Sequence, residues 1–333
     1  MIGTGIIPVG AAANELTAVT RRGFLHSLIV QIYNSSPFIA ALMSSAQFAS
    51  GGVSAVSVPV QGAPFVNAQN TDYSGSFNQP SAQQGAFLAE YNLKGFVVPI
   101  PFLGMEAAVQ IDYAVIPLIE ARMNDAGNAM TDLMATQAYS NTTNNLGMIG
   151  LNGAIDDGTN LVTYGNINRN TSAYWKSKVY SAGSVNPTRQ NVAQYINGVT
   201  KSAGEIPTFG LMGFGTWSLL QQDFIGQESY IITPSSSFDA ETGGPRAAFT
   251  ALKVSGVPIY PDPYCPEGFL YLPNARYLNL YLHQGASFAF SGFESTLSNF
   301  QLGYIGILLT IAELVCTKPK AMGRVGSYNS LVI

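Results

Sequence analysis

Residues 105–139 read MEAAVQIDYAVIPLIEARMNDAGNAMTDLMATQAY and carry the strongest helical pattern of the chain. Apolar side chains recur along them every three or four residues, as one buried face of an α-helix requires. These side chains are Val109, Tyr113, Ile116, Ile119, Met123, Met130 and Met134. Pro117 either kinks the segment or stands in the first turn of a new helix, so the long helix is predicted over residues 117–139. The methionines favour core packing over a metal site or an adaptable binding face.

The segment before this helix has the pattern of a long β-hairpin. Residues 56–60 place Val at alternate positions, as in a strand, and residues 87–102 return as a second strand. Pro99 and Pro101 mark the second strand as an edge strand, because proline has no N–H to donate. The chain between the strands is rich in Asn, Gln, Ser, Gly and Pro. A compact domain rarely carries so long a hairpin unless it reaches another molecule. We therefore expect a neighbouring subunit, rather than the chain's own core, to order residues 53–98.

The sequence before the hairpin has the pattern of an irregular arm followed by helix. Residues 1–11 are rich in Gly and Ala, which favours an irregular arm, and residues 12–49 have a helical pattern that Pro37 divides. Residues 23–71 contain no Asp, Glu, Lys or Arg. A stretch this long without charge is expected to lie on a neighbouring subunit or on the body of its own.

The chain after the long helix mixes short strands with helices, which predicts an α+β fold. A helix is expected over residues 188–203, with Thr188 as its N-cap and Gly204 as its stop, and a shorter helix is expected from Thr216 to Gln222. The predicted strands are residues 161–164, 207–214, 250–260, 269–272, 277–283, 286–290 and 300–316.

Charge is scarce along the whole chain. Its 333 residues include 15 Lys and Arg and 19 Asp and Glu, a formal net charge of −4, and charged residues make up 10 % where roughly 25 % is usual. This balance excludes a basic nucleic-acid binder held by counterion release and a strongly acidic steering surface. A monomer of this size would expose roughly 13,000 Å², or about 390 Å² for each charged residue. We therefore expect the chain to hide surface against other copies of itself, with a monomer coated by Ser, Thr, Asn and Gln as the alternative.

Neither a membrane span nor a secretory signal is expected. The uncharged stretch 295–312 is interrupted by polar residues, and the first basic residue is Arg21, so the basic start of a signal peptide is missing. The two cysteines, Cys265 and Cys316, fit a reducing compartment. Cys316 stands in an apolar run and is expected in the core, whereas Cys265 stands in a Pro-rich turn and is expected to be partly exposed.

The sequence indicates no catalytic or ligand-binding site. His26 and His283 stand far apart and are interpreted as packed or surface histidines, which argues against a zinc site. Neither a GxSxG motif nor a Gly-Lys dipeptide occurs. Residues 210–215, GLMGFG, lack the GxGxxG spacing and indicate a strand with close backbone approach. Residues 156–158, DDG, indicate a turn rather than a pair of catalytic carboxylates.

Charged side chains form two further groups. The long helix has an acidic side, interpreted as solvated, with Arg122 as its basic partner. Its acidic residues are Glu106, Asp112, Glu120, Asp125 and Asp132. Lys318, Lys320 and Arg324 make a basic cluster that is too small for strong DNA affinity. We therefore predict no catalytic, cofactor-binding or metal-binding residue, and we expect the chain not to be an enzyme.

Besides the order of its segments, the chain contains several short motifs that are informative together. They are TRRGFL at residues 20–25, TYGNINR at 163–169 followed by YW at 174–175, VSGVPI at 254–259 followed by a Pro-Asp turn, and residues 316–324 through KPKA. With an arm, a long polar hairpin, a long helix, a mixed domain and a final apolar strand, this order resembles the major capsid protein family of tailed bacteriophages over nearly the whole chain. The parts of that fold, which encapsulins share, are the N-arm, E-loop, spine helix, P-domain and A-domain.

The resemblance implies a division of the chain and a structural role. The implied parts are residues 1–50 (N-terminal arm), 51–104 (E-loop hairpin), 105–186 (spine helix and P-domain), 187–293 (A-domain) and 294–333 (return P-domain strand and C-terminus). The implied role is a major capsid protein that self-assembles as pentamers and hexamers into an icosahedral phage head around double-stranded DNA. Its implied location is the virion, after assembly in the host cytoplasm.

The implied partners are other copies of the chain, a separate scaffold protein, a portal and, in some heads, a decoration protein. DNA would be enclosed without sequence-specific binding, and no membrane or cofactor is implied. Because the family-like arm begins near Thr20, we expect no fused scaffolding domain. Some family members cross-link an E-loop lysine to a neighbour's asparagine. The first lysine here is Lys94 at the hairpin's base, and Lys176 and Lys178 lie outside the loop. We therefore expect particles boiled in detergent to give a single band of about 35 kDa.

Two other classes stay open on the sequence alone. An encapsulin-type compartment shares the fold but encloses proteins, so the contents of the particles would distinguish it. A β-rich hydrolase or carbohydrate-binding protein would form a small oligomer with ligand-dependent stability, and its size alone would distinguish it.

Overall fold

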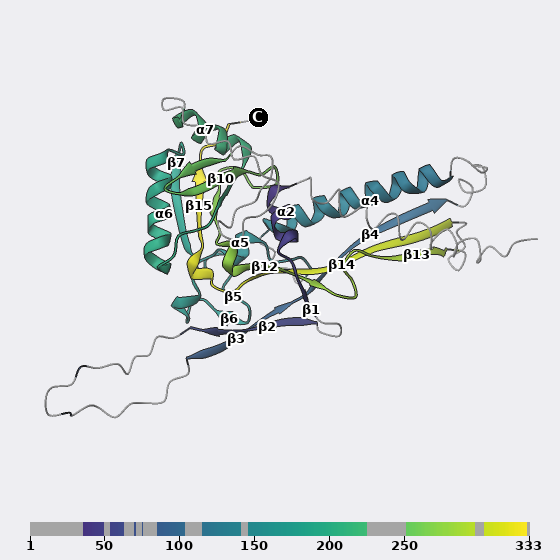
Figure 1. Cartoon of the computed structure of the whole chain (residues 1–333), viewed down its shortest axis with the longest axis horizontal. Helices are drawn as coiled ribbons and strands as arrows, with labels where there is room; N and C mark the ends of the chain where they lie inside the picture. The colour runs from purple at the N-terminus through teal and green to yellow at the C-terminus, as the bar shows by residue number, and fades with distance from the viewer. Residues whose placement is uncertain are drawn as a thin grey trace, which may run out of the picture.

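The computed structural model describes residues 36–49, 54–62, 70, 75, 85–103, 115–140, 146–224, 251–296 and 303–331. The predictions for the N-terminal arm, for the helix before Pro37 and for the tip of the hairpin lie outside these residues. Figure 1 shows an elongated molecule: a long helix and long strands extend to one side, and a second sheet with its helices gathers at the other.

The central sheet is built around the longest strand, β14 (Gly303–Cys316). One edge of β14 pairs antiparallel with β4 (Lys94–Leu103). Its other edge pairs antiparallel with β12 (Leu278–His283) and β13 (Ala289–Ser295). The short strand β1 (Gln47–Ala49) joins β12 in parallel. The long apolar strand predicted over residues 300–316 is confirmed from Gly303 onward, but its predicted place as the final strand is wrong, because β15 (Gly323–Tyr328) follows it.

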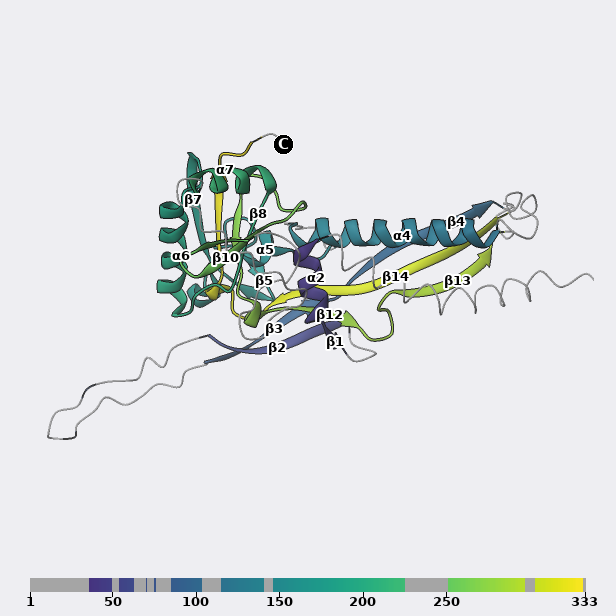
Figure 2. The same cartoon turned by 45° about the horizontal axis from the view of Figure 1, so that its top comes forward.

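The predicted long helix is α4 (Val115–Ala138), which runs along the central sheet in both views (Figures 1 and 2). Since it begins at Val115, Pro117 stands in its first turn, where a proline removes no helical hydrogen bond. Met123, Met130 and Met134 are fully buried in the main hydrophobic core. The prediction that these methionines pack in the core is confirmed.

The helix α2 (Pro37–Ser44) lies beside α4 and β12. Ser36 is its N-cap, and the Ser36 hydroxyl accepts a hydrogen bond from the Ile39 N–H at 3.4 Å. Phe38 and Leu42 are buried in the main core. Pro37 is therefore the first residue of a helix, whereas the helix predicted before it lies outside the described residues.

The second sheet lies at the opposite end of the molecule from the far end of α4 (Figure 2). In spatial order its strands are β7 (Lys178–Val185), β15 (Gly323–Tyr328), β11 (Leu270–Leu272), β8 (Gly210–Met212), β10 (Val257–Pro261) and β9 (Leu252–Val254). β15 thus carries the C-terminal part of the chain back into this sheet, beside β7 in parallel.

Two helices pack with the second sheet. The helix α6 (Arg189–Ala203) has the caps that its sequence predicted: the Thr188 hydroxyl accepts from the Asn191 N–H, and Gly204 adopts a left-handed φ of 75°. Its buried face carries Val192, Ile196 and Val199, which belong to a second hydrophobic core. The helix α7 (Phe214–Phe224) follows β8.

The remaining described elements belong to neither of these two sheets. The base of the hairpin is β2 (Ala55–Gln61) paired with β3 (Ala86–Asn92), and β5 (Thr163–Tyr164) pairs with β6 (Ile167–Asn168). The single-turn elements are α5 (Leu151–Ala154), η1 (Ala173–Trp175), η2 (Ala275–Tyr277) and η4 (Pro319–Ala321).

The return strand predicted over residues 87–102 is two strands. The chain changes direction at Leu93, whose N–H donates to the Ser54 carbonyl at 3.0 Å. Beyond it, β4 leaves the hairpin and pairs with β14, because its alternate apolar side chains complete the central core. Within the described residues β14 is the partner of β4, so the edge position that Pro99 and Pro101 predicted is confirmed.

Other boundaries also differ from the sequence prediction. Residues 250–260 form the hairpin β9–β10, because Ser255 and Gly256 take left-handed φ angles of 50° and 89° and turn the chain. The strand expected over residues 207–214 shortens to β8. The helix expected from Thr216 begins at Phe214, because the Glu267 carboxylate accepts hydrogen bonds from N–H groups of its first turn.

Candidate functional site

The root of the hairpin is fixed to the body of the molecule by aromatic side chains. Tyr91 of β3 is buried, and its hydroxyl donates to the Cys316 carbonyl at 2.9 Å. Its ring meets that of Tyr164 edge-on, with centroids 5.1 Å apart. Gly165 has a φ of +57°, and a Cβ there would lie 2.9 Å from the Tyr91 ring, so the position requires glycine.

A second aromatic contact holds the outer part of the root. Phe87 of β3 stacks on Tyr174, with ring centroids 5.6 Å apart. Gly62, directly after β2, lies against the same Tyr174 ring and has no room for a side chain. The expectation that a neighbour rather than the chain's own core orders all of residues 53–98 is therefore wrong for this base and for β4. The tip lies outside the described residues.

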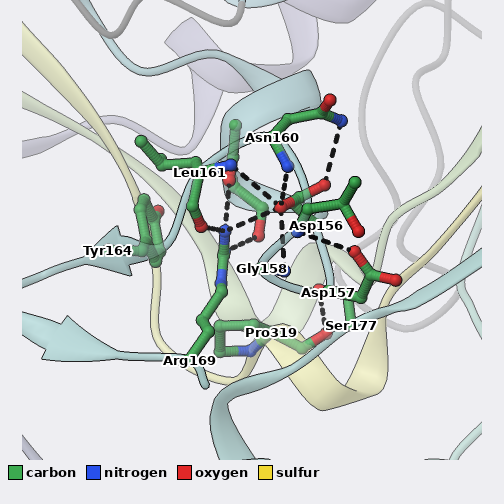
Figure 3. A network of polar contacts seen from close by, with 12 residues as sticks. Asp156, Asp157, Gly158, Asn160, Leu161, Tyr164, Arg169, Ser177 and Pro319 are labelled. Carbon is green, nitrogen blue, oxygen red and sulfur yellow. Dashed lines mark hydrogen bonds and ion pairs between the residues drawn. The ribbon is translucent and has the colours of Figure 1, made fainter. Parts of the chain in front are cut away.

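A buried ion-pair network lies close to this root (Figure 3). Asp156 and Arg169 have fully buried side chains, with a carboxylate oxygen 3.8 Å from the guanidinium. Arg324 of β15 approaches the other carboxylate oxygen at 3.3 Å. The Asp156 carboxylate also accepts hydrogen bonds of 2.9–3.1 Å from the backbone N–H groups of Gly158, Asn160 and Leu161. The network therefore joins the turn at 156–158 to both β15 and the segment that follows β6.

Arg169 ties together several stretches of backbone. Its guanidinium donates to the carbonyls of Gly153, Ala154, Leu161 and Trp175 at 2.7–3.3 Å. Burial lowers the pKa of Arg169, while Tyr164 and Asp156 act in the opposite direction. A buried guanidinium with this many acceptors positions loops rather than performing chemistry.

The sequence identified only part of this network. The turn predicted at residues 156–158 is confirmed, but its buried ion pair was missed because Arg324 lies 168 residues away. The predicted basic cluster of Lys318, Lys320 and Arg324 is wrong for Arg324, which is buried against Asp156. A signal existed in the TYGNINR stretch, which contains Arg169.

Glu313 is a second buried carboxyl, on β14. Its Oε1 accepts from the Ile149 N–H at 3.1 Å, and its Oε2 is buried with no hydrogen-bond partner among the described residues. Burial raises the pKa of Glu313 to about 8, against the opposing effects of that N–H and of Lys94. The group is therefore mostly a neutral acid at pH 7.

One face of the central sheet carries an apolar surface. The opposite face packs on α4, whereas cross-strand pairs of β4 and β14 point the other way. These pairs are Val97 with Leu309, Pro99 with Ile307 and Pro101 with Ile305. Val97 is 51 % exposed and Ile307 37 % exposed. We call this surface the outer face. Its paired positions carry no charge, which is the composition of an interface core.

The remaining sequence candidates are scattered. His283 is half-buried at the end of β12, and Asp125 and Asp132 are exposed on α4, as the solvated face predicted. His26, Glu106 and Asp112 lie outside the described residues, as does the side chain of Glu120. Cys316 is buried as expected, but Cys265 is also buried, so its predicted exposure is wrong.

The described residues contain no cluster of three His, Cys, Asp or Glu side chains that could hold a metal ion. No helix among them is long and apolar enough to cross a membrane. What the geometry offers instead is an anchored root of the hairpin and an outer face whose cross-strand pairs carry no charge.

Comparison with known proteins identifies the fold. The sequence matches no protein-family model and no curated protein. Among solved structures, the chain is similar to the capsid of cyanophage A-1(L), with a TM-score of 0.60, 12 % identity, and coverage of 88 % of this chain and 93 % of that one.

Two further structures extend the comparison. The capsid of the native GTA particle has a TM-score of 0.55 at 8 % identity, covering 87 % of this chain and 90 % of that one. The SrpI encapsulin of Synechococcus elongatus has a TM-score of 0.52 at 10 % identity, covering 88 % and 90 %. The chain therefore has the α+β fold of tailed-phage major capsid proteins, which encapsulins share, and the predicted fold is confirmed.

Proposed function

We propose that this protein is a structural major capsid protein that self-assembles into an icosahedral phage head around double-stranded DNA. The observation that carries the proposal is the outer face: a row of apolar cross-strand pairs on the central sheet of a capsid-type fold. Exposure of such an apolar row to water is unfavourable in free energy for a chain with so few charges. Contact with other copies of the chain buries the row and removes this penalty.

The scarcity of charge supports the same proposal. Charged residues make up 10 % of the chain, where roughly 25 % is usual. A subunit with so few charges gains stability when its apolar surface is buried against neighbours. Pentamers and hexamers provide that burial through contacts that close into rings.

The parts of the chain would then have the following roles. Along the sequence we assign residues 1–50 to the N-terminal arm, 51–104 to the E-loop hairpin, 105–186 to the spine helix and P-domain, 187–293 to the A-domain and 294–333 to the return strand and C-terminus. These ranges are divisions of the sequence and do not coincide with the two sheets. β4, from the hairpin range, lies in the central sheet, and β15, from the C-terminal range, lies in the second sheet.

The partners and location follow from the proposed role. Other copies of the chain are the main partner, with a separate scaffold protein, a portal and, in some heads, a decoration protein. The protein acts in the virion after assembly in the host cytoplasm, as a structural component rather than an enzyme. The DNA is enclosed without sequence-specific binding.

An encapsulin-type compartment is the second candidate, because the SrpI encapsulin has the same fold. Its TM-score of 0.52 is below the 0.60 of the cyanophage capsid, so we favour the capsid. A hydrolase or carbohydrate-binding protein has no support from the fold.

Sedimentation of the purified full chain tests the proposal. Megadalton particles are expected, and particles recovered from infected cells should contain nuclease-protected double-stranded DNA. Particles that enclose only protein cargo would favour the encapsulin. Monomers or dimers alone, both recombinantly and in infected cells, would contradict both candidates.

A further inference from the structure

Basic side chains gather at one end of the second sheet. Six of the twelve lysine and arginine residues in the described part of the chain belong to this group. They are Lys176, Lys178, Lys201, Arg276, Lys318 and Lys320. We call this surface the basic end. It differs from the cluster predicted from the sequence, since Arg324 is buried and four cations from other segments take its place.

Hydrogen bonds place the segments of the basic end against one another. The Ser177 hydroxyl donates to the Pro319 carbonyl at 2.8 Å, and the Lys178 N–H donates to the Met322 carbonyl at 3.3 Å. The segment with Lys176 and Lys178 therefore lies along η4, which Lys318 and Lys320 flank and enter.

The end of α6 and the start of η2 complete the surface. Val199 of α6 lies against Gly323, which brings the last helical turn with Lys201 beside η4. Hydrogen bonding from Lys318 is the main cause that lowers the pKa of Glu205, and Arg276 contributes to the same shift, so both cations face this carboxylate. In Figures 1 and 2 the lower end of α6 and the beginnings of β7 and β15 lie side by side.

The charge of the basic end is opposite to that of the whole chain. Within its described segments and the adjoining 156–158 turn, the carboxylates besides buried Asp156 are Glu205 and Asp157, so six cations face two acids. The whole chain has a formal net charge of −4. Lys178, Lys201 and Arg276 are exposed, and the other three cations are half-buried. Half of the lysine and arginine residues in the described part of the chain thus lie together on a surface with few carboxylates.

We propose that the basic end binds the phosphate backbone of double-stranded nucleic acid without reading its sequence. This inference rests on the proposed function, because it names the surface that would meet the enclosed DNA. Lysine predominates, and its ammonium acts as a point charge suited to phosphate contacts rather than to bidentate base recognition. Lys176 and Lys178 are two residues apart on extended chain, about 6.6 Å, so both can face one backbone. Because only a few phosphates are contacted, the binding is weak and salt-sensitive, unlike that of the strongly basic nucleic-acid binders that the net charge of the whole chain excludes.

Salt dependence of binding measures this contact directly. Each phosphate neutralised contributes about −0.9 to the slope of log affinity against log salt. About four contacts predict a slope near −3.6, which is a loss of about 150-fold between 50 and 200 mM NaCl. The assay is fluorescence anisotropy of a random-sequence DNA duplex with the unassembled full chain.

Matched variants locate the contact. Lys178→Gln and Lys201→Gln should each reduce the slope by about 0.9, and the double variant by about 1.8. Lys253→Gln is the control, because Lys253 is an exposed lysine on β9, at the far edge of the same sheet. It should leave the slope unchanged.

Two results would overturn the proposal. The first is an equal slope for the wild type, the basic-end variants and Lys253→Gln. The second is tighter binding of a polyglutamate peptide than of the duplex, with only the peptide's affinity changing in the variants. That result would identify an acidic protein as the partner. Sedimentation keeps this test separate from the proposed function, since shells that form normally from a protein with unchanged slopes would sink only this inference.

Discussion

Replacing Arg169 by methionine should destabilise the subunit far more than the same change at Arg189. Arg169 is fully buried, pairs with Asp156 and donates to the carbonyls described above. Removing one partner of a buried ion pair costs roughly 3–5 kcal/mol, because the other charge stays buried without compensation. Each carbonyl left without a donor adds to this cost. We therefore expect a loss of about 4 kcal/mol, a large share of the roughly 5–15 kcal/mol that stabilises a folded protein.

Arg189 provides a matched control on α6. It pairs with Asp223 at 3.4 Å, but its side chain is 39 % exposed, so Arg189→Met should cost less than about 1 kcal/mol. Urea unfolding of unassembled full-length subunits measures both changes, and Trp175 supplies a buried fluorescence probe whose carbonyl accepts from Arg169. With a slope of about 1–3 kcal/mol per molar urea, the Arg169 variant should unfold at least about 1 M earlier. Equal midpoints for the two variants would refute the reasoning.

Three further predictions use other parts of the structure. Gly165→Ala should cost about 2 kcal/mol in urea unfolding, since its φ is +57° and Tyr91 fills the space, whereas Gly95→Ala meets no atom within 4 Å and should cost nothing; equal losses would contradict this. Because burial raises the pKa of Glu313 to about 8 in the folded chain from 4.5, its contribution to stability is complete below pH 4.5 and is lost as the pH rises to 8, by up to about 1.4 kcal/mol per pH unit. Glu313→Gln should flatten that dependence in urea unfolding between pH 5 and 9, and an unchanged slope would disprove it. Deleting residues 63–84 should leave the unfolding midpoint unchanged, because the hairpin's root is anchored in the subunit, but should prevent shell formation; normal shells would overturn this.

Elements fixed by local patterns could be predicted from the sequence. The helix α6 is an example, because Thr188, Gly204 and its apolar spacing all lie within the same short stretch. The core position of the methionines on α4 followed equally from helical spacing. Both depend on interactions between residues a few positions apart, which periodicity and capping rules describe.

Features that depend on distant partners could not be predicted. The start of α7 is set by Glu267, about fifty residues further on, which no capping rule applied to α7 itself reveals. The change of direction at Leu93 depends on β14 being available to β4. The role of Asp156 was hidden for the same reason, because a DDG stretch looks like an exposed turn until Arg169 and Arg324 are placed beside it.

Cryo-electron microscopy of particles assembled from the purified full chain tests the central claim most directly. The proposed function predicts closed icosahedral shells of pentamers and hexamers. In the reconstruction, the outer face of β4 and β14 should be covered by another copy of the chain or by a head partner. Open or small oligomers, or closed shells in which Val97 and Ile307 remain exposed to solvent, would contradict it.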